Sequence, residues 1–121
     1  MKKRIFILIG LAAFVFSFTF ASAMNHTAEE RGKVHFNNPL FADGKKSCST
    51  CHFNGRGLKG ASTKTAFSIM GGKQASLEEV INVCIVNANK GNPLDTNSTE
   101  MRELATYIKS LGSKATSGYG K

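Results

Sequence analysis

Residues 48–52, Cys-Ser-Thr-Cys-His, are the most informative segment of this 121-residue chain. Cys-x-x-Cys-His is the attachment motif of c-type haem. Two thiols three residues apart can reach the two vinyl groups on one edge of a porphyrin and form thioether bonds with them. The imidazole that follows is placed to bind the iron as an axial ligand. The motif therefore predicts one covalent haem c held by Cys48, Cys51 and His52.

Three other roles for the cysteine pair fit the sequence less well. A structural zinc site takes four ligands, and the chain offers only Cys84, His26 and His35 in addition, at irregular spacing. A thioredoxin-like redox pair belongs to a βαβ unit, which the hydrophobic pattern does not predict. A disulfide between Cys48 and Cys51 would close a very small loop.

The first 23 residues have the pattern of a signal peptide. A basic start at residues 1–4 precedes an uncharged apolar run at residues 5–20, and Ala21-Ser22-Ala23 supplies small residues for a signal peptidase. We expect cleavage before Met24, export to the periplasm and no stable membrane insertion afterwards. The alternative is an uncleaved N-terminal anchor facing the periplasm, although the apolar run is shorter than the roughly 20 residues of a membrane span.

The rest of the chain is long enough for one small domain, predicted at residues 24–112, followed by a flexible tail at residues 113–121. A domain of this size buries a modest fraction of its surface, so a bound prosthetic group can add much to its core. The whole chain has a formal net charge of +8, and loss of the signal peptide would leave about +5. This basic charge favours redox partner proteins with acidic surfaces, although a charge that serves solubility alone fits as well. The lysines are scattered and form no basic stripe, which argues against nucleic acid.

Hydrophobic periodicity predicts three helices, at residues 27–37, 76–91 and 98–112. Thr27 and Ser76 each precede a glutamate by three residues, as in a capping box. The segment between the first two helices is rich in Gly, Ser, Lys and Asn and shows no strand pattern. A structureless insert of that length is unusual in a small domain, and we expect it to wrap around a bound group.

With these features the chain resembles the monohaem class I c-type cytochromes over nearly its whole mature length. The resemblance rests on Gly32 and Phe36 in the N-terminal helix, the attachment motif, and Leu104 and Tyr107 in the C-terminal helix. It implies an all-α domain with the class I cytochrome c fold. In that fold the N- and C-terminal helices cross, with a glycine permitting close contact, around one covalently bound haem. The function implied is that of an electron carrier and not an enzyme.

A narrower resemblance covers residues 81–111, INVCIVNANKGNPLDTNSTEMRELATYIKSL. This segment is similar to the haem domains of thiosulfate dehydrogenases and of the sulfur-oxidising Sox cytochromes. In those domains a cysteine of the corresponding helix is the second axial ligand, and Cys84 occupies the matching place. The resemblance also implies an alternative function, as an electron-accepting subunit or partner of a thiosulfate- or sulfur-oxidising enzyme.

The residues alone leave several candidates for the sixth iron ligand. Many electron-carrying cytochromes use methionine, and Met70 in a loop suits this role better than Met101, which fits an inward core position. His26 and His35 suit surface or structural roles. Cys84 can be a small buried hydrophobe, but iron would protect a lone thiol in an oxidising compartment. With the resemblance added, Cys84 becomes the preferred ligand, and Met70, Met101 or an open site stay as alternatives. An open site would suit a gas or redox sensor.

Overall fold

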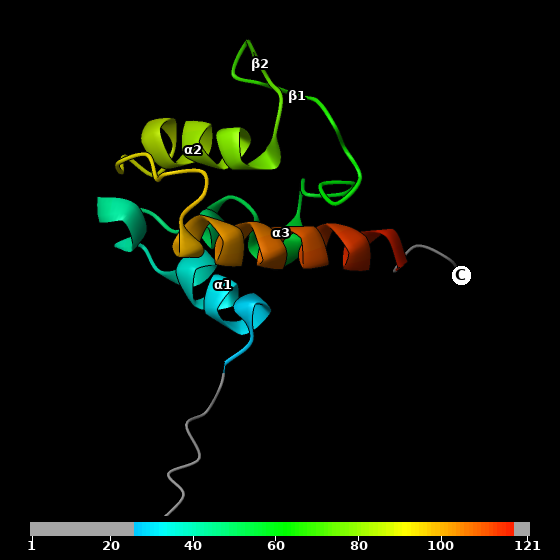
Figure 1. Cartoon of the computed structure of the whole chain (residues 1–121), viewed down its shortest axis with the longest axis horizontal. Helices are drawn as coiled ribbons and strands as arrows, with labels where there is room; N and C mark the ends of the chain where they lie inside the picture. The colour runs from blue at the N-terminus through cyan, green and yellow to red at the C-terminus, as the bar shows by residue number, and fades with distance from the viewer. Residues whose placement is uncertain (1–25, 118–121) are drawn as a thin grey trace, which may run out of the picture.

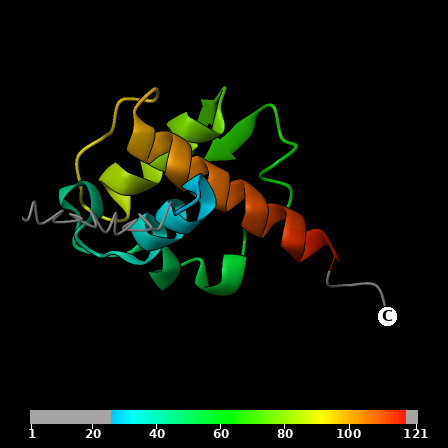
Figure 2. The ribbon, with the colours of Figure 1, turned by 60° about the horizontal axis from the view of Figure 1, so that its bottom comes forward.

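The computed structural model describes residues 26–117, so the predicted signal peptide (1–23) and the end of the predicted tail (118–121) lie outside the described residues. Within these residues no helix is both long enough and apolar enough to cross a membrane. The elements are three α-helices, three 3-10 turns and one antiparallel hairpin: α1 (Ala28–Asn37), η1 (Phe41–Asp43), η2 (Cys48–Thr50), η3 (Phe53–Gly55), β1 (Phe67–Ile69), β2 (Gly72–Gln74), α2 (Leu77–Asn87) and α3 (Thr99–Ser117). Helix α3 runs through the middle of the molecule, with α1 crossing one side and α2 lying on another (Figures 1 and 2).

The predicted start of α1 is confirmed. Thr27 Oγ1 accepts a hydrogen bond of 3.2 Å from the Glu30 amide, and the Thr27 amide donates to Glu30 Oε2 at 2.7 Å. The two bonds form the reciprocal capping box expected from the sequence. Asn38, before Pro39, takes an extended conformation and ends the helix.

The crossing of α1 and α3 is the most extensive helix contact in the described residues. A side-chain carbon on Gly32 would collide with the backbone carbonyl of Glu103, so only glycine allows this approach. One turn further along α1, the ring of Phe36 meets Tyr107 edge-on with ring centroids 5.3 Å apart. The mostly helical fold and the crossing of the terminal helices are thus confirmed.

The predicted ends of the second and third helices are wrong. Helix α2 stops at Asn87, before Gly91, because the next residues turn away; Lys90 adopts a positive φ of 60°. Helix α3 continues past Gly112 to Ser117. Gly112 is needed for close packing, since a side-chain carbon there would lie 2.7 Å from the carbonyl oxygen of Leu58. Gly112 therefore allows α3 to pack closely against the loop at Leu58, and it does not end the helix.

The middle segment contains a short β-hairpin that the sequence analysis did not predict. Phe67 pairs with Gln74 and Ile69 with Gly72, so each strand has only three residues. Strands this short give too few residues for an alternating pattern to be recognised. The turn residues Met70 and Gly71 both have positive φ, 50° and 78°, as a tight hairpin turn requires.

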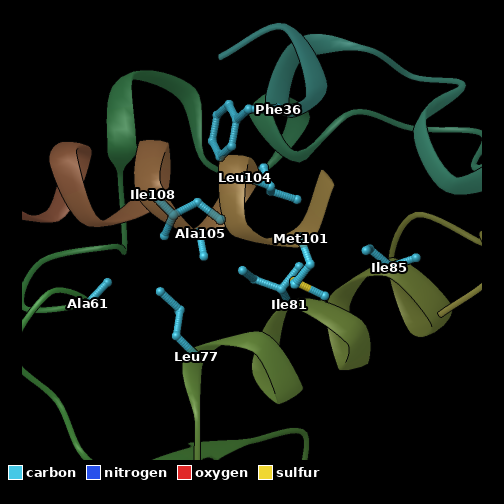
Figure 3. Packing of buried hydrophobic residues seen from close by; sticks show 9 residues of the cluster. All are labelled: Phe36, Ala61, Leu77, Ile81, Ile85, Met101, Leu104, Ala105 and Ile108. Carbon is cyan, nitrogen blue, oxygen red and sulfur yellow. The ribbon is translucent and has the colours of Figure 1, made fainter. Parts of the chain in front are cut away.

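Helices α2 and α3 enclose most of the apolar core, and Phe36 of α1 and Ala61 complete it (Figure 3). Leu77, Ile81 and Ile85 project from α2 toward α3, at the predicted helical spacing. Figure 3 shows the nine buried side chains of the cluster, which are Phe36, Ala61, Leu77, Ile81, Ile85, Met101, Leu104, Ala105 and Ile108.

Candidate haem-binding site

A cavity of about 380 Å³ lies beside this core, between the attachment motif, the loop at residues 57–69 and α2. Its volume is in the range of small-molecule and cofactor pockets, roughly 300–1,000 Å³. The walls are mainly aliphatic and aromatic. The apolar lining side chains are Phe36, Leu58, Ala61, Ala66, Phe67, Ile69, Leu77, Val80, Ile81, Ala88 and Ile108.

The attachment motif forms a 3-10 turn that brings its three functional side chains to this cavity. The amides of Cys51 and His52 donate to the carbonyl of Cys48 at 3.2 and 3.0 Å. In a 3-10 turn, residues three apart lie one above the other, so the two cysteines share one side. Cys48, Cys51 and His52 all line the cavity, and both thiols are free.

The His52 ring is held by the backbone of the loop that follows it. Nδ1 lies 2.8 Å from the carbonyl oxygen of Arg56. A carbonyl only accepts hydrogen bonds, so Nδ1 carries the proton and donates. In the neutral ring, Nε2 is then the nitrogen with the lone pair, as in most metal-binding histidines.

Cys84 lies on the side of the cavity formed by α2. It stands in the middle of a row of lining residues, Val80, Cys84 and Ala88, spaced one helical turn apart. Burial raises the pKa of the Cys84 thiol, and the nearby Cys48 and Cys51 raise the pKa further. Cys84 thus lines the same cavity as Cys48 and Cys51.

The other candidate ligands are elsewhere. Met101 is fully buried in the core and does not line the cavity. Met70 is 62 % exposed at the hairpin turn, outside the cavity lining. His35 Nε2 pairs with Glu103 Oε2 at 3.0 Å, and His26 is exposed beside Glu30. Of the five candidates named from the sequence, only Cys84 lines the cavity together with His52.

Asn89 is a site residue that the sequence analysis missed. Its side chain is 7 % exposed and lines the cavity, and its Nδ2 donates to Cys48 Sγ at 3.6 Å. Burial raises the pKa of the Cys48 thiol, while the bond from Asn89 opposes that rise. A polar residue just after the apolar run of α2 was the available signal. Lys59 and Lys64 also line the cavity and bring positive charge to it.

These residues fit a covalently bound haem. The cavity is apolar, two free thiols face it from one turn, and an imidazole with an available Nε2 follows them. Together with the crossed terminal helices, this arrangement defines a c-type cytochrome domain. The family model described as "SoxA/TsdA, cytochrome c domain" matches residues 31–116, and the chain belongs to this family. No curated protein and no solved structure gives a significant match.

Membership of the family establishes the general activity. A cytochrome c domain carries covalently attached haem c and transfers electrons through it. The resemblance to Sox-type and thiosulfate dehydrogenase haem domains, first seen in residues 81–111, agrees with the family that matches.

Proposed function

We propose that this protein is a periplasmic monohaem cytochrome that carries single electrons between redox partners and is not itself an enzyme. The observation that carries the proposal is the meeting of Cys48, Cys51, His52 and Cys84 around one apolar cavity. The sequence contains one attachment motif, which corresponds to one haem. When bound, haem supplies a one-electron iron(III)/iron(II) couple.

Each residue of the site has a distinct role in this proposal. Cys48 and Cys51 would fasten the cofactor through thioether bonds, and His52 would bind iron through Nε2 while the Arg56 carbonyl holds its ring. Cys84 would supply a second, thiolate ligand from α2. The aliphatic walls would limit the access of water to these ligands and so influence the reduction potential.

Mass spectrometry and spectroscopy of the purified holoprotein test these assignments. A chain that begins at Met24 and carries the mass of one haem supports both the single cofactor and the cleaved signal peptide. An intact N-terminus would favour the membrane-anchored alternative. The bare polypeptide mass, from cells with working haem-attachment machinery, would overturn the proposed function.

Replacement of Cys84 tests the axial ligand. A thiolate donates electron density to iron and lowers the reduction potential relative to methionine. We therefore expect Cys84→Met to raise the reduction potential and to change the EPR spectrum of the oxidised protein. The matched control is Met70→Ala, which removes a sulfur atom outside the cavity. Unchanged EPR and optical spectra in Cys84→Ala would exclude Cys84 as the ligand.

The family match also favours a second candidate function, in which the protein accepts electrons within a thiosulfate- or sulfur-oxidising enzyme. Joining two thiosulfates releases two electrons, whereas one haem accepts one, so the chain would act with a partner subunit. Haem reduction by thiosulfate, measured for the protein alone and with candidate partners, separates the two functions. Reduction only in a mixture supports the subunit role, and no reduction in any mixture supports the general carrier.

The surface charge suggests what kind of partner the carrier meets. Without the signal peptide, which contains Lys2, Lys3 and Arg4, thirteen of the sixteen lysine and arginine residues remain against eight acidic ones. This excess favours partners with acidic surfaces. If it attracts such a partner, the bimolecular rate of electron exchange will fall as ionic strength rises. A rate independent of salt would argue against an acidic partner surface.

A further inference from the structure

The segment that follows α2 is fastened to the segment that precedes the attachment motif. The amide of Lys45 donates to the carbonyl of Asn89 at 2.8 Å, and the amide of Asn92 donates to the carbonyl of Ala42 at 2.7 Å. The side chain of Asn92 adds a bond of 3.0 Å to Asp43. A side-chain carbon on Gly91 would lie 2.5 Å from the Ala42 carbonyl oxygen, so the two backbones are in close contact there.

Asn89 lies where this contact meets the cavity. Its amide donates to the carbonyl of Cys84 at 3.0 Å, its carbonyl accepts from Lys45, and its side chain donates to Cys48 Sγ at 3.6 Å. One residue is thus hydrogen-bonded to the helix turn that carries Cys84, to the chain leading to the motif, and to the first sulfur of the motif. Its side chain is among the few buried polar ones, so this orientation is well determined by its surroundings.

We propose that Asn89 is a positioning residue for the cofactor. Its side-chain amide holds the sulfur of Cys48 in one orientation, and its backbone fixes how far that sulfur stands from the Cys84 side of the cavity. Sulfur remains a weak hydrogen-bond acceptor as a thioether, so Cys48 can still accept this bond after attachment. The inference rests on the proposed function, because it assumes haem at Cys48 and an axial ligand at Cys84.

The proposal requires a side chain at position 89 that can donate a hydrogen bond to sulfur. A near-isosteric aliphatic side chain would fill the same space without donating to sulfur, leaving the Cys48 side chain and the attached edge of the porphyrin free to shift relative to Cys84. We expect Asn89→Leu to retain covalent haem but to shift the reduction potential. We also expect its EPR spectrum to show more than one low-spin species in place of one.

Asn87→Ala is the matched control. Asn87 is the last residue of α2, two positions before Asn89, and its side chain donates to the carbonyl of Val83 at 2.9 Å. It is exposed and lies outside the cavity lining. We expect the control to keep the wild-type spectrum and potential. If Asn89 had a purely structural role, Asn89→Leu would lower the melting temperature but would change neither the EPR spectrum nor the reduction potential.

A measurement on the wild-type holoprotein covers the case in which Asn89→Leu does not fold. In NMR spectra, the side-chain amide protons of Asn89 should exchange slowly with solvent, and the nearby haem should change their chemical shifts. Neither effect is expected for the side-chain amide of Asn87. A solvent-averaged Asn89 amide would overturn the proposal, as would an Asn89→Leu holoprotein with wild-type EPR spectrum and potential. A wild-type protein without attached haem would instead overturn the proposed function and this inference together.

Discussion

At the scale of single residues, the position of each sulfur atom separates ligand candidates from packing residues. Cys84 faces the cavity from α2, whereas Met101 is fully buried against Leu104 and its neighbours in the core. Met70 is exposed at the hairpin turn, where its positive φ is part of the turn. Loss of each sulfur should therefore have a different effect on stability and on the haem spectrum.

Met101→Ala should reduce the free energy of unfolding by about 2–5 kcal/mol, the usual cost of removing a large buried side chain. The optical and EPR spectra of the folded holoprotein should stay unchanged, because Met101 does not line the cavity. Met70→Ala is the control, and we expect no measurable loss of stability from this exposed residue. Denaturant unfolding followed by haem absorbance gives both readings. A changed axial-ligand spectrum in Met101→Ala would contradict this assignment.

The residues that the sequence identified are those whose chemistry is contained in a local motif. Cys48, Cys51 and His52 follow from five consecutive letters. The carbonyl of Arg56 and the side chain of Asn89 could not be identified in this way. Their roles depend on how two loops bend back on the motif, and no local pattern encodes that path.

At the scale of elements, the starts of the helices and the end of α1 before Asn38 were predictable, whereas the ends of α2 and α3 were not. Thr27 and Ser76 both cap their helices as expected. At the second helix, however, the Glu79 carboxylate accepts from the amide of Ala75 and not from that of Ser76, so the capping box is not reciprocal there. The two misjudged glycines, Gly91 and Gly112, serve close approaches to other segments. A glycine required by tertiary contact and one required by a helix end look alike in a sequence.

Gly32→Ala tests the crossing of α1 and α3. Alanine favours an isolated helix over glycine by about 1 kcal/mol, but here its methyl group would meet the Glu103 backbone. Overpacking of this kind usually costs about 1–3 kcal/mol, occasionally more, so we expect a net loss in the free energy of unfolding. Lys33→Ala, at the exposed neighbouring position, is the control for helix propensity. A Gly32→Ala protein as stable as the wild type would show that the helices can separate without penalty.

Glu103 adds a pH-dependent term to the same crossing. Arg31 chiefly, and His35 in addition, lower the pKa of this buried carboxyl group through hydrogen bonds, while burial opposes the shift. Because the folded pKa is lowered, the stabilisation is complete above the unfolded pKa of about 4.3 and is lost as pH falls through the folded value. Glu103→Gln should therefore be less stable than wild type at neutral pH, and the difference should shrink in acid. A difference that is constant from pH 7 to 3 would contradict this sign.

At the scale of the whole molecule, the core and the cavity share walls. Phe36, Ala61, Leu77, Ile81 and Ile108 belong to the buried cluster and also line the cavity. The general architecture followed from the motif and three periodic segments. The sequence could not show which apolar residues pack against other protein residues and which line the cofactor cavity. Periodicity identifies the buried face of a helix but not what covers that face.

Because the walls are shared, the protein without haem should lose part of its fold. Without haem, the shared apolar walls border an unfilled cavity of about 380 Å³ that exposes them to water or must collapse. Either outcome is a large loss for a small domain, whose total stability is only about 5–15 kcal/mol. Cys48→Ser/Cys51→Ser, which cannot attach the cofactor, should therefore show a large fall in melting temperature.

Hydrogen exchange in this double variant should increase most in α2 and the hairpin, which border the cavity. It should increase least at the Gly32 crossing, where α1 and α3 contact each other directly. Cys84→Ser keeps both attachment thiols and should remain protected throughout. Equal exchange protection in the double variant and in the holoprotein would mean that the helices hold the cavity open by themselves, and the haem would then add nothing to the fold.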